Sequence, residues 1–216
     1  MENLKTFKPP RTIASVIRGL LTRQRHRLES APVTENDRRG PLLDKLPQRG
    51  ICAEVGVWKG QFSQRILSRL EPRELQLVDP WTFCPQFPDR WYGGAAAKSQ
   101  EEMDQIFSQV VKRFQAFPQV KVVRSPSVLA AKSFPDNYFD WVYIDGDHSF
   151  DDVLSDLRAW APKIRRGGHL AGDDFNWRDE DMVFSVRNAV LAFANERRLP
   201  IAFVEGGQFL LRLHAT

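Results

Sequence analysis

Carboxylates gather at the ends of two apolar segments in the second half of the 216-residue chain. Asp145 follows the segment 138–144, and Asp173 and Asp174 follow the segment 167–171. If these segments are neighbouring parallel strands, the three acids meet at the C-terminal edge of a sheet, where α/β proteins bind ligands. Three adjacent acids resist ionisation unless a cation neutralises them, and carboxylate oxygens suit Mg²⁺ or a similar hard ion. We therefore predict a metal site, with local turn capping by Asp145 and Asp174 as the alternative.

Asp147 and His148 lie just after Asp145 in the sequence and are candidates for a general base. Either side chain could accept the proton of a substrate hydroxyl while the metal lowers the pKa of that hydroxyl. Alternatively, Asp147 stabilises the start of the next helix and His148 only packs or forms a hydrogen bond. The sequence leaves the choice of base open.

A second candidate site is the loop 54–60, where an apolar strand turns into a helix. Glycines let the backbone pass close to a ligand, and the N-terminus of the following helix offers free N–H groups. The alternative is that a turn of this kind needs glycine for steric reasons alone. The predicted ligand-binding residues of this loop are Glu54, Gly56, Val57, Trp58 and Gly60.

Asp79 ends the next apolar strand, at the ~20-residue separation from the glycines at which a carboxylate binds a ribose diol. We expect Asp79 and the adjoining Pro80 to contact the ribose of a nucleoside cofactor, although Asp79 could also be a solvated loop residue. Arg124 and Ser125 end the third strand and are expected to flank the adenine.

The residue at the start of the glycine loop separates two cofactor classes. A dinucleotide site usually has a glycine where Glu54 stands, because the pyrophosphate needs close approach and no carboxylate. S-adenosylmethionine has no phosphate, and its ammonium and sulfonium groups tolerate a nearby acid. Glu54 therefore favours S-adenosylmethionine over NAD.

The elements that position these residues alternate between extended apolar segments and amphipathic helices, which is typical of a mostly parallel sheet covered on both faces. Two final strands are joined across Gly206 and Gly207 and must form an antiparallel hairpin, because no crossover helix fits between them. The predicted strands lie at 51–55, 75–78, 120–123, 138–144, 167–171, 201–204 and 208–213, and the helices at 62–70, 99–117, 149–160 and 183–193. The segment 81–97 is predicted to be a surface insertion, and its residues 81–92 are, together with the N-terminal helix, a candidate lid.

The formal charge is only +4, and basic residues are concentrated before residue 40. We predict a basic helix at 12–21 followed by a linker over residues 30–40, and a main domain over residues 41–216. The helix could touch a membrane surface or an acidic partner, dock on its own domain, or support a homo-oligomer.

We expect no nucleic-acid partner. We also expect no membrane span, because no apolar run approaches the ~20 residues that a span requires. The two cysteines form no disulfide framework or metal motif, so a cytoplasmic location is expected.

Together these motifs resemble the class I S-adenosylmethionine-dependent methyltransferases over roughly residues 48 to 214. The sequence is most similar to methyltransferase domain family 24, through the residues 144–150, the pair Asp156-Leu157, and Arg166-Gly167-Gly168 with the later acid pair at 173–174. The resemblance implies a Rossmann-like, doubly wound sheet of seven strands, with the last strand antiparallel.

The sequence is also similar to the metal-dependent macrocin-type sugar O-methyltransferases. That resemblance implies metal binding by Asp145, Asp173 and Asp174, with Asp147 as the base; His148 departs from the pattern. We expect metal-assisted O-methylation of a small hydroxylated acceptor, such as a sugar, a diol or a catechol. An NAD-dependent oxidoreductase and a catalytically silent methyltransferase-like binding module are the alternatives.

Overall fold

The computed structural model describes residues 38–86, 88, 91–178 and 181–213. The basic helix predicted at 12–21, and most of the linker predicted over 30–40, lie outside these residues. In the part of the chain that is described, no helix is long and apolar enough to cross a membrane.

A seven-stranded sheet forms the centre of the domain, with the strand order β3-β2-β1-β4-β5-β7-β6. Strands β1 to β5 run parallel to one another, and β7 runs antiparallel to both of its neighbours, β5 and β6. The fold is therefore the Rossmann-like sheet with a C-terminal hairpin that the sequence predicts. The strands are β1 (Ile51–Val55), β2 (Glu74–Asp79), β3 (Val120–Arg124), β4 (Phe139–Ile144), β5 (Ile164–Gly172), β6 (Ile201–Glu205) and β7 (Gln208–Arg212).

Strand β4 occupies the middle of the sheet, and every one of its residues is buried. This agrees with its nearly continuous apolar sequence, because a strand covered on both faces has no polar side to present. Strand β5 begins at Ile164, earlier than predicted, and the fold also contains a short helix, α5, that is not among the predicted helices.

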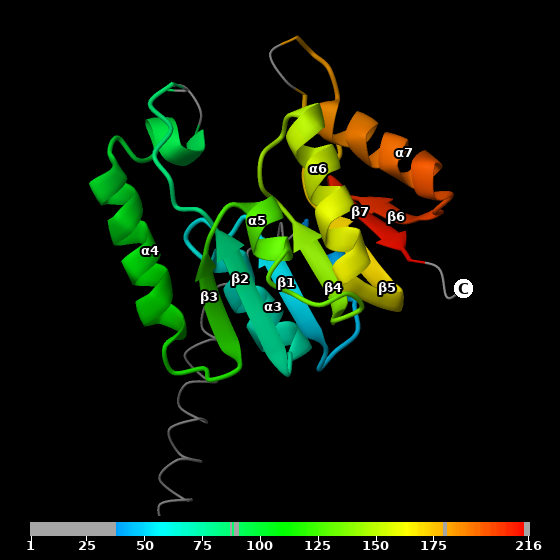
Figure 1. The fold of residues 1–216 in the computed structure, drawn as a ribbon, viewed down its shortest axis with the longest axis horizontal. Coiled ribbons are helices and arrows are strands. Elements are labelled where there is room, and N and C mark those ends of the chain that lie inside the picture. The colour runs from blue at the N-terminus through cyan, green and yellow to red at the C-terminus, as the bar shows by residue number, and fades with distance from the viewer. Residues whose placement is uncertain (1–37, 87, 89–90, 179–180, 214–216) are drawn as a thin grey trace, which may run out of the picture. The chain divides into compact units, whose positions relative to one another are not determined.

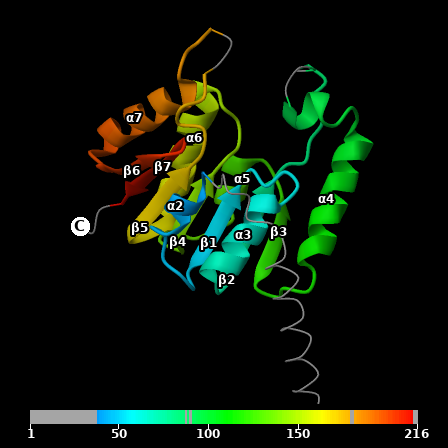
Figure 2. The ribbon, with the colours of Figure 1, turned by 180° about the vertical axis from the view of Figure 1, so that it is seen from behind.

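Helices cover both faces of the sheet. Figure 1 shows α5, α6 and α7 on one face, and Figure 2 shows α2 and α3 on the other; α4 lies beside the edge strand β3. Buried residues of α5, α6 and α7 form one hydrophobic cluster with the strands beneath them. The helices are α2 (Gly40–Leu43), α3 (Gln61–Leu70), α4 (Gln100–Phe114), α5 (Ser127–Ala131), α6 (Phe150–Trp160) and α7 (Ser185–Arg197), with a short 3₁₀ turn, η2, at Ala161–Lys163.

Serine N-caps fix the starts of two helices. The hydroxyl of Ser99 accepts a hydrogen bond from the backbone N–H of Glu102 and begins α4. The hydroxyl of Ser149 accepts one from the N–H of Asp152 and begins α6. The cap of α6 matters for the site, because this helix starts directly after His148.

The predicted insertion after β2 contains one irregular helical turn, η1 (Trp91–Ala95), with Gly93 in the left-handed region. The start of the insertion is not at the surface. Trp81 is fully buried, and its indole Nε1 donates a hydrogen bond to the carbonyl of Trp58 at 2.9 Å. This contact fastens the insertion to the glycine loop.

Candidate active site

The turn between β1 and α3 depends on two glycines in the left-handed region. Gly56 has a φ of +89°, and a Cβ at this position would lie 1.8 Å from the main-chain oxygen of Asp145. Gly60 has a φ of +73° and is the N-cap of α3; a Cβ there would lie 2.9 Å from the ring of Phe114. The close approach of Gly56 to Asp145 brings the predicted cofactor loop against the predicted metal site.

Asp79 lies beneath this loop and is 2% exposed. Its Oδ2 accepts hydrogen bonds from the N–H groups of Val57 (3.0 Å) and Trp58 (2.9 Å). Its Oδ1 accepts from the N–H of Trp81 (2.7 Å) and from the hydroxyl of Tyr92. Burial raises the pKa of Asp79. In this structure, therefore, the carboxylate holds the loop in place, and the Tyr92 hydroxyl makes the contact predicted for a ribose hydroxyl.

The other residues predicted to surround the nucleoside also gather at the end of β2. Arg124 donates hydrogen bonds to the carbonyls of Pro80 (3.3 Å) and Trp81 (3.0 Å) and forms an ion pair with Asp104. The N–H of Ser125 donates to the carbonyl of Asp79 at 3.1 Å. The structure thus brings Pro80, Arg124 and Ser125 together with Asp79.

Glu54 is 1% exposed and lies within β1, between β2 and β4. Its Oε2 is buried and has no hydrogen-bond partner among the described residues. Burial raises the pKa of Glu54 to about 8. A buried carboxylate oxygen without a donor is costly, so this position fits a ligand that carries a cationic donor.

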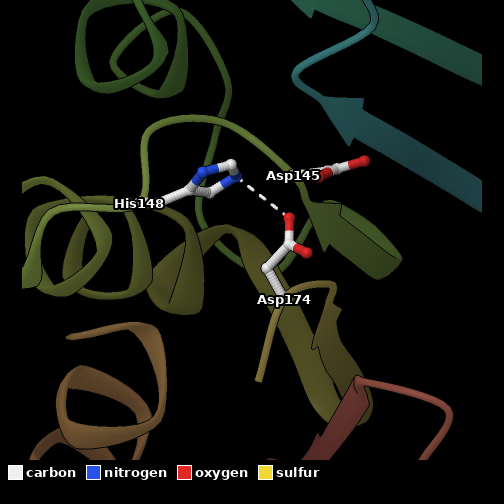
Figure 3. A group of neighbouring side chains, drawn as sticks. All are labelled: Asp145, His148 and Asp174. Carbon is white, nitrogen blue, oxygen red and sulfur yellow. Dashed lines mark ion pairs between the residues drawn. The ribbon is translucent and has the colours of Figure 1, made fainter. Parts of the chain in front are cut away.

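The acids that follow β4 and β5 meet at one edge of the sheet, as predicted. The two strands are parallel neighbours, with Ile144 opposite Gly172. Asp145, His148 and Asp174 each offer a ligand atom, and these atoms lie within 4.8 Å of one another. Figure 3 shows these side chains in the loops that follow the two strands. The group contains two of the three predicted metal ligands, together with the histidine.

His148 and Asp174 form an ion pair, with 3.0 Å between His148 Nε2 and Asp174 Oδ2 (Figure 3). The imidazole also lies against the ring of Trp177, at a centroid distance of 5.0 Å. Burial lowers the pKa of His148, but the hydrogen bond and the charge of Asp174 outweigh it, and the pKa is raised. Asp174 thus orients the imidazole and makes it a stronger base.

The pKa values of Asp145 and Asp174 are shifted in opposite directions. Burial raises the pKa of Asp145 to about 6, although the charge of Arg39 acts against this shift. For Asp174 burial also acts to raise the pKa, but the contact with His148 prevails and lowers it. A cation beside Asp145 would therefore favour its ionised form.

Asp173 is near this group but has other partners. Its carboxylate forms an ion pair with Arg39, and it accepts hydrogen bonds from the side chain of Gln208 and from the N–H of Asp174. Arg39 also pairs with Asp145, at 2.9 Å. The sequence does not predict Arg39 and Gln208 as site residues, because an arginine in a polar stretch and a glutamine in a strand carry no motif.

Asp147 contributes to the start of α6. Its Oδ1 accepts a hydrogen bond from the N–H of Ser149 at 2.8 Å. This contact fits the alternative role given above for Asp147, which is to stabilise the start of the next helix. Asp147 also lines a pocket with the three grouped side chains, and the pocket has an apolar side that includes Val153, Val186 and Phe209. The pocket leaves a small space against the acids, about the size of a water molecule or an ion.

A sequence model of methyltransferase domain family 24, described as "Methyltransferase domain", matches residues 53–175. No curated protein matches the chain. A proposed caffeoyl-CoA O-methyltransferase from Staphylococcus aureus has a similar structure (TM-score 0.57, 12% identity, covering 91% of each chain).

Two further solved structures share the fold. One is a proposed O-methyltransferase from Klebsiella pneumoniae (TM-score 0.56, 17% identity, covering 92% of this chain and 90% of that one). The other is a 1,6-didemethyltoxoflavin-N1-methyltransferase from Burkholderia thailandensis with bound S-adenosylhomocysteine (TM-score 0.54, 12% identity, covering 98% and 93%).

Proposed function

We propose that this chain methylates a hydroxyl oxygen of a small acceptor. The chain belongs to the class I S-adenosylmethionine-dependent methyltransferases of methyltransferase domain family 24. Family membership excludes the NAD-dependent oxidoreductase that the sequence left as an alternative. The observation that supports hydroxyl methylation is the His148–Asp174 pair beside Asp145, at the edge of the sheet next to the glycine loop. This pair offers a base where a hydroxyl could be placed.

S-adenosylmethionine would lie across the ends of β1 and β2. The unpartnered, buried Oε2 of Glu54 fits the ammonium group at its methionine end. The residues around Asp79 would contact the adenosine, with a ribose hydroxyl taking the place of the Tyr92 hydroxyl. The remaining predicted cofactor contacts are Gly56, Val57, Trp58, Gly60, Pro80, Arg124, Ser125 and Asp145.

His148 would accept the proton of the acceptor hydroxyl, and Asp174 would hold the imidazole in position and stabilise its charged form. The acceptor oxygen would then attack the sulfonium methyl in line. Most of the rate enhancement would come from holding the oxygen and the methyl at near-attack distance. Asp147 is the second candidate for the base, although its carboxylate is already engaged at the start of α6.

A divalent cation fits the same three side chains. Asp145, His148 and Asp174 would hold it with two carboxylate oxygens and one imidazole nitrogen, a mixed set that suits Mn²⁺, Fe²⁺ or Zn²⁺ as well as Mg²⁺. When bound, the cation would lower the pKa of a coordinated hydroxyl. With His148 occupied as a ligand, Asp147 would be left to accept the proton.

The test is methyl transfer from labelled S-adenosylmethionine to a panel of sugars, diols, catechols and amines, with and without chelator. His148→Gln and Asp174→Asn should each reduce transfer to oxygen by about 100-fold or more while S-adenosylmethionine still binds. Arg158→Gln is the matched control, because it removes only an exposed ion pair with Glu196 and should leave transfer unchanged.

Each part of the proposal can fail separately. Transfer to amines alone would contradict hydroxyl methylation. Binding of S-adenosylmethionine without transfer to any acceptor would favour the binding module. Activity that is insensitive to chelator would exclude metal assistance and leave His148 as the base.

A further inference from the structure

Arg39 reaches the acid cluster from outside the segment that the family model matches, which is residues 53–175. It is the residue before α2. Its Nη2 lies 2.9 Å from Asp145 Oδ2 and also forms an ion pair with Asp173. A single guanidinium therefore bridges the acid that ends β4 and the first acid after β5.

Aromatic side chains and a glutamine hold this bridge in place. The guanidinium carbon of Arg39 lies 4.8 Å from the ring centroid of Phe62 and 5.9 Å from that of Tyr143. The Tyr143 hydroxyl donates to Gln208 Oε1 at 2.6 Å, and Gln208 donates in turn to Asp173. Arg39 is thus part of a built network.

We propose that Arg39 is a permanent cation of this site, which takes Asp173 out of the metal-ligand set and weakens the binding of a divalent ion to Asp145, His148 and Asp174. This inference rests on the proposed function only in treating those three side chains as a cation site. The guanidinium stays charged at any physiological pH, so its single positive charge offsets part of the negative charge of Asp145 and Asp173 whether or not a metal is present.

Removing the guanidinium leaves Asp145 and Asp173 without their shared counter-charge, and neighbouring uncompensated acids attract a hard cation. Asp173 would then be able to join Asp145 and Asp174. The result is the three-acid metal site that the sequence predicts, which in this protein is occupied in part by an arginine.

The experiment is a titration of Mn²⁺, followed by the EPR signal of the free ion, with the full-length protein and its variants. Arg39→Met keeps the apolar contact with Phe62 and should bind Mn²⁺ roughly tenfold more tightly or better, because one positive charge is lost beside the ion. Adding Asp173→Asn to Arg39→Met should abolish most of this gain. Arg38→Met is the matched control: Arg38 is exposed and its charge acts on Asp174, but its loss should change the affinity by no more than about twofold.

Mn²⁺ affinity of Arg39→Met equal to or weaker than that of the wild type would overturn the inference. If the wild type binds no Mn²⁺ and Arg39→Met does, the inference stands while metal assistance in the proposed function fails. If Arg39→Met is too unstable for the titration, thermal melting with and without Mn²⁺ serves instead. The ion should raise the Tm of Arg39→Met more than that of the wild type. Arg39→Lys, which keeps the charge, should remain near the wild type by both measurements.

Discussion

Replacing Gly56 with alanine tests the contact that joins the cofactor loop to the acid cluster. The new methyl group would lie 1.8 Å from the carbonyl oxygen of Asp145, about 1.2 Å short of the closest separation that a real Cβ reaches. Because that oxygen belongs to the backbone, no side-chain rotation relieves the clash. The ends of β1 and β4 would have to move apart, and the loop would move with them.

The expected cost has two parts. The left-handed backbone at Gly56 costs an alanine about 1–2 kcal/mol. Overpacking adds about 1–3 kcal/mol, which gives a total loss of about 2–5 kcal/mol in the free energy of unfolding. For a domain of this size the loss corresponds to a fall of roughly 4–20 °C in Tm. Binding of S-adenosylmethionine should weaken as well, because Val57 and Trp58 move away from Asp79.

Two other glycines separate strain from clash in the same assay, which is denaturation by heat and by urea. Gly167 has a φ of +74°, but a Cβ at this position would meet no atom of the described residues within 4 Å. Gly167→Ala should therefore show the backbone strain alone, a loss of about 1–2 kcal/mol in the free energy of unfolding. Gly146→Ala meets only the carboxylate of Asp156, at 3.5 Å, and should cost less than about 1 kcal/mol. A loss for Gly56→Ala no larger than that for Gly167→Ala would refute the contact with Asp145.

Three further predictions concern the residues around the site. Ser149→Ala removes the N-cap of α6 and should lower the free energy of unfolding by about 1 kcal/mol in urea denaturation; Ser99→Ala, the cap of α4, should cost a similar amount. Because the pKa of Glu54 is raised from 4.5 to about 8 in the folded state, the stability of the ligand-free protein should fall as the pH rises between these values. Glu54→Gln should flatten this pH dependence, and an unchanged profile would show that Glu54 is not buried as described. Asp174→Asn removes the contact that raises the pKa of His148, so NMR titration of the imidazole should give a lower pKa than in the wild type; an unchanged pKa would exclude the ion pair.

The sheet was predictable because its determinants are local. Strand β4 is apolar except for Asp140, and the hairpin of β6 and β7 follows from two glycines with no room for a crossover. Helix α5 was missed because its five residues are too few to show a helical period. Trp81 was placed in a surface insertion, although its ring is buried, because the prolines and glycines around it dominate the local pattern.

The site was predictable where motif and topology agree. The end of a strand places an acid at the edge of the sheet, so the meeting of Asp145 with Asp174 follows from the pairing of β4 and β5. The partners of Asp173 were not predictable. Arg39 and Gln208 come from opposite ends of the chain, and only the folded structure brings them to this acid. The roles assigned to the individual site residues, the domain boundary at residue 40 and the homo-oligomer stay predictions.

Following the methyl group itself tests hydroxyl methylation most directly. The protein is incubated with S-adenosylmethionine that carries a ¹³C-labelled methyl group and with the acceptor panel, and the ¹³C chemical shift of the product identifies the atom that receives the methyl. We expect an O-methyl signal with the wild type and its loss with His148→Gln. An N-, S- or C-methyl product, or an O-methyl signal of undiminished intensity with His148→Gln, would contradict it.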